Sequence, residues 1–343
     1  MKQVAWRMAG RVKRSKRNGA LASSGRMVAP LGLLAKQALS QTVPDALAQT
    51  RSTLACYQAL RRRRPRKVYG QIGGLEVRLA ETKADIRRAQ RLRYRVFYEE
   101  MAASPSFTAM VRRLDEDPYD PICDHLLVTD KVPSTANPWT NRRHPEVVGT
   151  YRLLRQEMAE RGRGFYTQGE YDIAPLIKNQ PAGTRFLELG RSCVLESYRT
   201  KRTVELLWHG LWTYVRENKI DVMIGCASFE GTDPKEHAMA LSLLHHQSLA
   251  PLEWRCRAHA GLHQRMDLIP KDQLDLKAAL RVMPPLIKGY LRLGAFVGDG
   301  AVIDHQFGTT DVLIVMPVAK INPRYFGHFG APGEVKSRVA LEG

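Results

Sequence analysis

The sequence predicts an α/β fold, in which a mixed central sheet is flanked by helices and preceded by a basic N-terminal extension. First, apolar strand-like runs alternate with amphipathic helical stretches from Leu75 onward. Second, two strongly apolar runs, at residues 186–195 and 222–229, lie on either side of a helical stretch, which indicates two neighbouring central strands. Third, positive charge is concentrated at the N-terminus.

The elements are expected to mix strands and helices along the chain. Residues 75–79 alternate apolar and polar side chains as in a strand, and Thr82 is placed to cap a helix that runs to residue 101. Residues 155–185 are rich in glycine and proline, and are expected to form an insertion over the sheet, as a lid would. The other expected elements are strands at 125–128, 147–154, 186–195, 222–229, 301–304 and 311–318, and helices at 202–219, 234–250 and 284–293.

Charge divides the chain into three expected regions. These are a basic extension over residues 1–74, partly helical or disordered, a folded domain over residues 75–330, and a C-terminal tail over residues 331–343. Residues 1–70 hold sixteen lysines or arginines and one acid, Asp45, and so contribute +15 of the formal net charge of +19. The folded domain is therefore expected to be close to neutral.

The extension has several candidate partners. Val4, Met8 and Val12 recur at helical spacing beside Trp6, as in an interfacial helix. The arginine run at 61–64 would be attracted to anionic lipid by about 1 kcal/mol per basic residue. A solvated tail, a nucleic-acid-binding segment and an organelle transit peptide share this composition. We expect an anionic membrane surface as the partner, and do not expect nucleic acid.

Cysteine usage and hydropathy indicate a reducing compartment and no membrane span. The five cysteines are an odd number with no CxxC spacing, which is typical of cytoplasmic proteins. No apolar run reaches the length of about 18 residues that a transmembrane helix needs. We therefore expect a cytoplasmic protein that is at most peripheral on a membrane.

Four short segments carry the clearest functional signal. They read Leu-Arg-Tyr-Arg-Val-Phe at 92–97, Asp-Glu-Asp-Pro-Tyr-Asp at 115–120, Val-Gly-Thr-Tyr-Arg-Leu-Leu at 148–154 and Phe-Leu-Glu-Leu-Gly-Arg at 186–191. In this order and spacing the chain resembles the acyl-homoserine-lactone synthases and their relatives, the ornithine-lipid N-acyltransferases, both of the GNAT superfamily. The resemblance covers residues 75–330, and implies a GNAT fold and the attack of an amine on an acyl thioester.

Glu188 is the leading candidate for the general base, because an amine attacks only after losing a proton. It lies on an apolar strand, three positions before Arg191 and with Gly190 between them, and a glycine there permits a bulge that splays the strand. The synthases have a similar Glu-Leu-Ser-Arg segment, and GNAT folds split the sheet there, exposing an amide for the thioester oxygen. The alternative is a buried ion pair that only fixes the strand.

Five further residues match positions of the family. Asp117 and Asp120 match a paired-aspartate motif, Arg152 matches an arginine on the next strand, and Arg93 and Phe97 match an Arg-x-x-x-Phe on the first helix. An arginine can hold a substrate carboxylate through two parallel hydrogen bonds. We expect the first three to serve catalysis with the Glu–Arg pair, and the last two to bind substrate. The alternative is a structural ion-pair network under a loop.

The acyl donor is expected to be acyl carrier protein. The turn at 198–203 lacks the glycines of a pyrophosphate loop, so Arg199, Lys201 and Arg202 are expected to receive the phosphate of phosphopantetheine or the acidic surface of the carrier protein. The alternative is an exposed basic turn without a ligand. Beyond the phosphopantetheine thioester we expect no cofactor. We expect no metal either, since the histidines lack a ligand pattern.

One departure favours the ornithine-lipid branch. Ala103 stands where the synthases, which use S-adenosylmethionine, carry a tryptophan. The resemblance implies transfer of a 3-hydroxyacyl chain from acyl carrier protein to the α-amine of L-ornithine, giving lyso-ornithine lipid at the inner face of a bacterial membrane. An α-amine has a pKa of about 8 against about 10.4 for a lysine-like amine, and loses its proton more easily. The alternatives are an acyl-homoserine-lactone synthase and an inactive membrane- or nucleic-acid-binding protein of the same fold.

Overall fold

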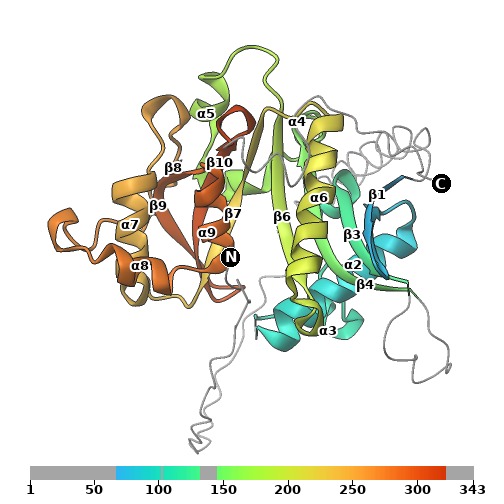
Figure 1. Ribbon diagram of the computed structural model, residues 1–343. Helices are drawn as coiled ribbons and strands as arrows, with labels where there is room; N and C mark the ends of the chain where they lie inside the picture. Colours follow the sequence, from blue (N-terminus) through green and yellow to red (C-terminus); the bar gives the residue numbers. More distant parts are fainter. Residues whose placement is uncertain (1–66, 102, 132–144, 322–343) are drawn as a thin grey trace, which may run out of the picture.

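A computed structural model describes residues 67–101, 103–131 and 145–321 (Figure 1). The strands are β1 (Val68–Ile72), β2 (Leu75–Leu79), β3 (Asp124–Asp130), β4 (Glu146–Arg155), β5 (Tyr171–Asp172), β6 (Phe186–Val194), β7 (Val222–Glu230), β8 (Arg257–Ala258), β9 (Phe296–Asp304) and β10 (Thr309–Pro317). They form one mixed sheet in the order β1-β2-β3-β4-β6-β7-β10-β9-β8-β5. The two apolar strands of the sequence, β6 and β7, lie at its centre, as expected.

Helices pack against this sheet. They are α2 (Lys83–Tyr94), α3 (Phe107–Arg112), α4 (Gln156–Glu160), α5 (Ala174–Lys178), α6 (Lys201–Glu217), α7 (Ala238–Ser248), α8 (Leu276–Val282) and α9 (Pro285–Leu293). The longest of them, α6, crosses in front of the sheet in Figure 1 and packs on β1, β2 and β3. A Cβ at Gly210 would lie 2.5 Å from the side chain of Val77, so this glycine lets the helix approach the sheet closely.

The first helix follows the sequence prediction at its start and differs from it at its end. Thr82 caps α2 by accepting a hydrogen bond from the backbone N–H of Asp85, whose side chain accepts in return from the N–H of Thr82. The helix then widens into a π-helical segment, η1 (Arg95–Glu100), which the sequence did not indicate. Such segments are frequent at functional sites, and η1 carries Phe97.

The boundary predicted between extension and domain is wrong by several residues. Residues 68–72, assigned to the extension, form β1 and pair antiparallel with β2. Tyr69 is buried in the main hydrophobic core. The folded domain therefore begins by Val68, while residues 1–66 and 322–343, with the helix predicted near Trp6, lie outside the described residues.

Residues 155–185 are a fixed part of the structure rather than a lid. Phe165, Tyr171, Ile173 and Leu176 are fully buried in a second hydrophobic cluster that also holds Phe186 of β6. Tyr171 donates a hydrogen bond to the carbonyl of Gly300 at 2.9 Å and so ties the segment to β9. The glycines and prolines obscured these buried positions in the sequence.

The sheet splits between β6 and β7. These strands pair in parallel only over Phe186, Leu187 and Glu188, and then diverge. Gly225 marks the last close approach, because a Cβ there would lie 2.2 Å from the carbonyl oxygen of Leu189 and its φ is +155°. The predicted bulge is confirmed in the pairing of β4 with β6, although the residue with positive φ is Arg191, at 51°, and not Gly190.

Among the described residues, no helix is both long enough and apolar enough to span a bilayer.

Candidate active site

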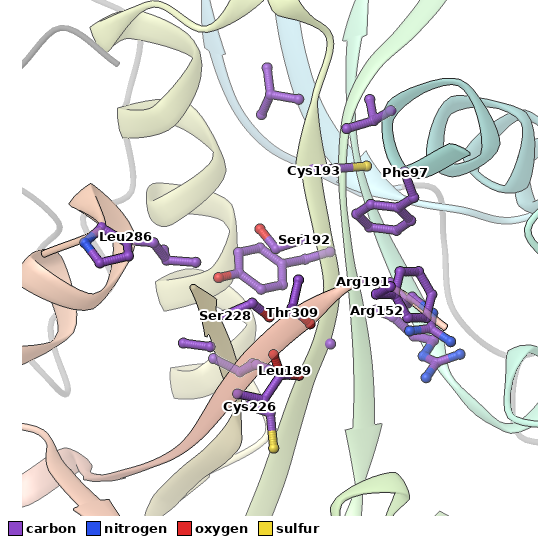
Figure 2. Close-up of a pocket in the computed structure, with 18 of the residues that line it drawn as sticks. Phe97, Arg152, Leu189, Arg191, Ser192, Cys193, Cys226, Ser228, Leu286 and Thr309 are labelled. Carbon is purple, nitrogen blue, oxygen red and sulfur yellow. The ribbon is translucent and has the colours of Figure 1, made fainter. Parts of the chain in front are cut away.

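A pocket of about 680 Å³ occupies the gap where β6 and β7 diverge (Figure 2). One part of its wall is apolar and includes Phe97 of η1, Leu207 and Trp208 of α6, and Leu286 of α9. The rest is polar and strongly acidic, because seven acidic residues and three arginines line the pocket as a whole. The pocket therefore suits a ligand with an apolar part and a cationic part.

The predicted aspartates and arginines come together beside this pocket in one ion-pair network. Arg93 pairs with Asp115 at 2.7 Å and with Asp120 at 2.8 Å, and its side chain is fully buried. Arg152 pairs with Asp117, and Arg191 lies 3.3 Å from the same carboxylate. We call these six residues, Arg93, Asp115, Asp117, Asp120, Arg152 and Arg191, the paired cluster. Its three arginines balance its three aspartates, so the cluster is formally neutral.

Attraction between opposite charges shifts the pKa values of Arg93 and Asp120 in the paired cluster. Burial alone would raise the pKa of Asp120, but the attraction of Arg93, with smaller contributions from His125 and Arg152, holds that pKa well below its usual range. Burial likewise works against the charge on Arg93, and its two aspartates outweigh that effect and raise its pKa. Mutual attraction thus favours the charged forms of Arg93 and Asp120 in spite of their burial.

Arg191 is the member that reaches furthest toward the pocket. Its guanidinium lies 4.6 Å from the ring centre of Phe307 and 5.2 Å from that of Tyr166. Phe97 meets Phe307 edge-on at 5.5 Å, so the predicted substrate-binding aromatic belongs to the same wall. In Figure 2, Phe97, Arg152 and Arg191 lie toward one side of the pocket and Leu286 toward the other.

Glu188 is buried in the pocket wall, and its carboxylate is held by three donors. It accepts hydrogen bonds from the backbone N–H of Tyr166 at 2.8 Å and of Thr167 at 2.6 Å, and from the hydroxyl of Thr167. Both donor residues belong to the 3-10 turn η3 (Tyr166–Gly169). Burial raises the pKa of Glu188 against the lowering effect of these bonds. The residue thus fixes η3 and keeps a raised proton affinity.

The three predicted donor-binding residues surround the start of α6. Arg199 lines the pocket, donates to the carbonyl of Val194 at 3.0 Å and pairs with Glu100. Lys201 and Arg202 are exposed in the first turn of α6, where Lys201 lies 3.4 Å from Glu205. Thr200 caps this helix by accepting from the N–H of Thr203.

Sequence reasoning missed a second group of acids in the same pocket. Glu170 follows η3, Asp304 ends β9 and Asp311 lies on β10, and their carboxylates all lie within 4.8 Å of one another. We call these three residues the unpaired cluster. The available signal was Asp311, the only charged residue of β10.

The unpaired cluster has perturbed proton affinities. Burial, and then the charge of Asp311, raise the pKa of Glu170 to about 7. Burial also raises the pKa of Asp311 to about 6, although the nearby hydroxyls of Thr309 and Ser228 oppose the rise. Perturbed carboxyls in a pocket are typical of functional sites.

Comparison with known proteins identifies the family. Residues 92–209 match the family described as "Acetyltransferase (GNAT) domain". The L-ornithine N(alpha)-acyltransferase of Agrobacterium fabrum is 53% identical over 267 residues, which cover 78% of this chain and 89% of that protein. The enzyme of the same name from Brucella abortus is 54% identical, over 77% of this chain and 92% of that protein. This chain belongs to the L-ornithine N(alpha)-acyltransferase family. The predicted GNAT fold and the resemblance to this family are thereby confirmed.

More distant relatives and solved structures were also compared. The L-ornithine N(alpha)-acyltransferase of Rhodobacter capsulatus is 42% identical over 73% of this chain and 92% of that protein. FeeM, an N-acyl amino acid synthase from uncultured soil microbes, is 12% identical with a TM-score of 0.40, over 71% of this chain and 91% of that chain. The AHL synthase LasI is 13% identical with a TM-score of 0.40, over 75% and 95%. The family assignment rests on the sequence relatives.

Proposed function

We propose that this protein transfers a 3-hydroxyacyl chain from acyl carrier protein to the α-amine of L-ornithine, giving lyso-ornithine lipid. The observation that carries the proposal is the pocket at the split of β6 and β7, whose lining combines apolar side chains with seven acidic residues and three arginines. An acyl chain suits the apolar side chains, and ornithine, with two amines and one carboxylate, suits the charged ones. The names of the relatives agree with this acceptor.

The reaction needs a proton acceptor, an oxyanion donor and a fixed geometry. We assign proton acceptance to Glu188, whose raised pKa suits the role. The amine nitrogen then attacks the thioester carbon, the carbonyl oxygen becomes an oxyanion, and the C–S bond breaks to release the carrier thiol. Backbone N–H groups of β6 beyond Glu188, where the pairing with β7 ends, are placed to donate to the oxyanion.

The paired cluster positions the acceptor. We assign the substrate carboxylate to Arg191, which lines the pocket and whose guanidinium is held by Asp117 at 3.3 Å and Asp115 at 3.4 Å. Arg152 pairs with Asp117 and Asp120 and so fixes these aspartates in turn. Phe97 and Arg93 support the same wall from the first helix. Arginine suits this role because it binds a carboxylate through two parallel hydrogen bonds.

The donor is proposed to dock at the start of α6. Arg199, Lys201 and Arg202 place positive charge around a helix N-terminus, which favours a phosphate or an acidic protein surface. The same residues stand where an ordinary CoA-binding loop would need glycines. We therefore propose phosphopantetheine on acyl carrier protein as the donor.

The basic extension is proposed to hold the protein on the inner face of the bacterial membrane, where the amphiphilic product is needed. Its +15 charge supports attraction to anionic lipid. The bulk of the extension lies outside the described residues.

Purified protein tests the proposal directly. With 3-hydroxyacyl-carrier protein and ornithine, mass spectrometry should detect an N-acylated ornithine, and acetyl-CoA should be a poor donor. Efficient acetylation from CoA with no activity on the carrier-protein thioester would contradict the donor assignment. A lactone product would instead indicate a homoserine-lactone synthase.

A further inference from the structure

We propose that the unpaired cluster of Glu170, Asp304 and Asp311 binds the side-chain ammonium of the amino-acid acceptor. The site would select a diamino acid over a neutral one, and would also direct acylation to the α-amine. This inference rests on the proposed function, because it takes ornithine as the acceptor.

The three acids reach one point from three separate elements. Glu170 comes from the end of η3, Asp304 from the end of β9 and Asp311 from β10, and all three line the pocket. The thiol of Cys226 donates to Glu170 at 3.1 Å, which fixes one of its oxygens. Asp304 is fixed by the backbone N–H groups of Gln306 and Phe307. The carboxylates of Glu170 and Asp304 are thus oriented before any ligand arrives.

In the part of the chain that the structure describes, no cation forms an ion pair with this cluster, and Arg191 acts on Asp311 only from a distance. Within the described ranges, none of its acids forms a salt bridge with a lysine, arginine or histidine, whereas each aspartate of the paired cluster has an arginine. Buried charges are normally paired, since an isolated one loses its hydration without compensation. A ligand cation would supply the missing charge.

Two buried polar atoms at the cluster have unused hydrogen-bonding capacity, although the hydroxyls of Thr309 and Ser228 act on the carboxyl of Asp311. Oγ1 of Thr309, a residue only 3% exposed, and Oδ1 of Asp311, 7% exposed, have no partner with hydrogen-bond geometry among the described residues. Residues 309 and 311 are two apart on β10, so their side chains project to the same face of the strand. Figure 2 shows Thr309 among the side chains of the pocket. An ammonium has three N–H donors and would satisfy such acceptors.

The negative charge of the unpaired cluster explains why only the α-amine of ornithine would attack the thioester. A carboxylate cluster stabilises the protonated form of an amine, and so raises its pKa above an already high value of about 10.4. A protonated amine has no lone pair with which to attack a thioester. The side-chain nitrogen is thereby held inactive while the α-amine, outside the cluster, can lose its proton to Glu188.

Ornithine and norvaline provide a matched pair of acceptors, because norvaline has the same carbon chain without the side-chain amine. Steady-state kcat and KM should be measured for both with wild type, Asp311→Asn and Glu170→Gln. The exposed acid Asp272, on the 3-10 turn Lys271–Gln273 and absent from the pocket wall, supplies the control variant Asp272→Asn. The position of the acyl group in each product is read by tandem mass spectrometry.

Wild type should prefer ornithine over norvaline by about 10²-fold or more in kcat/KM, because norvaline leaves buried polar groups unpaired. Asp311→Asn and Glu170→Gln should raise KM for ornithine by about tenfold or more and leave norvaline unchanged or improved. They should also yield some product acylated on the side-chain nitrogen. Asp272→Asn should behave as wild type.

The outcomes separate the inference from the function on which it rests. Wild type that acylates neither amino acid overturns the proposed function. Wild type that uses both equally, or variants that lose both equally while remaining folded by thermal melting, overturns the ammonium site alone. Loss of ornithine preference on adding EDTA, with recovery on adding Mg²⁺ or Ca²⁺, would assign the three carboxylates to a metal instead.

Discussion

Two acidic clusters border the same pocket, and they differ in one respect. In the paired cluster, Asp115, Asp117 and Asp120 each face an arginine, and the charges balance. In the unpaired cluster, Glu170, Asp304 and Asp311 face one another and hydroxyl, thiol and amide groups. In the paired cluster the pKa of Asp120 is held low. In the unpaired cluster the pKa of Glu170 is raised to about 7 and that of Asp311 to about 6.

Because of this difference, we expect the paired cluster to stabilise the fold and the unpaired cluster to recognise the substrate. In a balanced ion-pair network the charges compensate one another without substrate. Its removal should therefore reduce the stability of the protein more than it reduces the rate of the reaction. An unbalanced carboxylate cluster lacks a compensating charge until a cation binds. Its removal should therefore weaken substrate binding and, in the free protein, should increase stability because buried like charges are removed. Each prediction below tests one side of that contrast.

The largest expected effect is on stability, at the centre of the paired cluster. Arg93→Ala leaves the buried Asp115 and Asp120 with only their longer contacts to Arg191, at 3.4 Å, and to Arg152, at 3.5 Å, and should lower the free energy of unfolding by about 3–5 kcal/mol. Urea denaturation of the variant and of wild type measures this change in the free energy of unfolding. Arg265→Ala, which breaks the exposed pair with Asp267, is the control and should leave the free energy of unfolding nearly unchanged. Equal losses in the two variants would contradict the structural role of the paired cluster.

Glu188 interacts electrostatically with Arg152 of the paired cluster and with Glu170 of the unpaired cluster, and its hydrogen-bond donors are neutral. Glu188→Gln removes the proton acceptor, and kcat should fall by about 10²–10⁴. The amide cannot accept from both Tyr166 and Thr167, so melting curves must accompany the kinetics. Arg152→Ala and Asp120→Ala should also lose activity, but together with stability. Wild-type turnover in a folded Glu188→Gln protein would show that the residue only fixes η3.

Asp311→Asn should stabilise the free protein above pH 6. The pKa of Asp311 is raised from 3.8 to about 6 by folding, so its ionisation lowers the stability of the folded state as pH rises from about 4 to 6. The variant escapes this loss, and should gain about 1–3 kcal/mol at pH 8 and nothing near pH 3. Denaturation at both pH values measures the gain. A loss of stability at pH 8 would mean that Asp311 already has a partner.

The preference for ornithine should depend on pH. The ratio of kcat/KM for ornithine to that for norvaline should rise between pH 5 and pH 8, because the carboxyls ionise with pKa values of about 6 and about 7. Titration of the α-amine cancels in this ratio. A ratio that is flat with pH would exclude these acids from recognition. Groups whose charge acts on the two acids are Asp304, Cys226, Glu188 and Arg191.

The smallest effect on turnover is expected from the extension. Deletion of residues 1–66, rather than 1–70 because Tyr69 and Gly70 lie in β1, should leave ornithine acylation intact. Binding to anionic vesicles should be lost, and in the full chain it should weaken as salt rises, since exposed charges are screened over about 8 Å at physiological salt. Equal co-sedimentation of both proteins would contradict the membrane proposal, and preferential retention on DNA would favour nucleic acid.

The sequence predicted the elements whose signals are local. Residues 186–195 and 222–229 were identified as central strands because apolar side chains fill them, and Thr82 was identified as a cap from residue type alone. The motif aspartates and arginines were expected to meet, and they do so in one network. For these strands, this cap and this network, the local sequence pattern predicted what the tertiary structure shows.

The unpaired cluster could not be predicted in the same way. Glu170 lies in a segment without periodicity, and more than 130 residues separate it from Asp304 and Asp311. Only the folding of β9 and β10 against β7 brings them together. The burial of residues 165–176 was missed for a related reason, because their partners on β8 and β9 are distant in sequence.

A competition assay tests the central claim most directly. Equimolar ornithine and norvaline are offered with one 3-hydroxyacyl-carrier protein to wild type and to Asp311→Asn, and the ratio of the two N-acyl products is measured by mass spectrometry. That ratio equals the ratio of kcat/KM and is independent of the amount of active enzyme. We predict a large excess of ornithine product acylated on the α-nitrogen with wild type, and a ratio at least tenfold smaller with the variant. An unchanged ratio, or no ornithine product from wild type, would contradict the account.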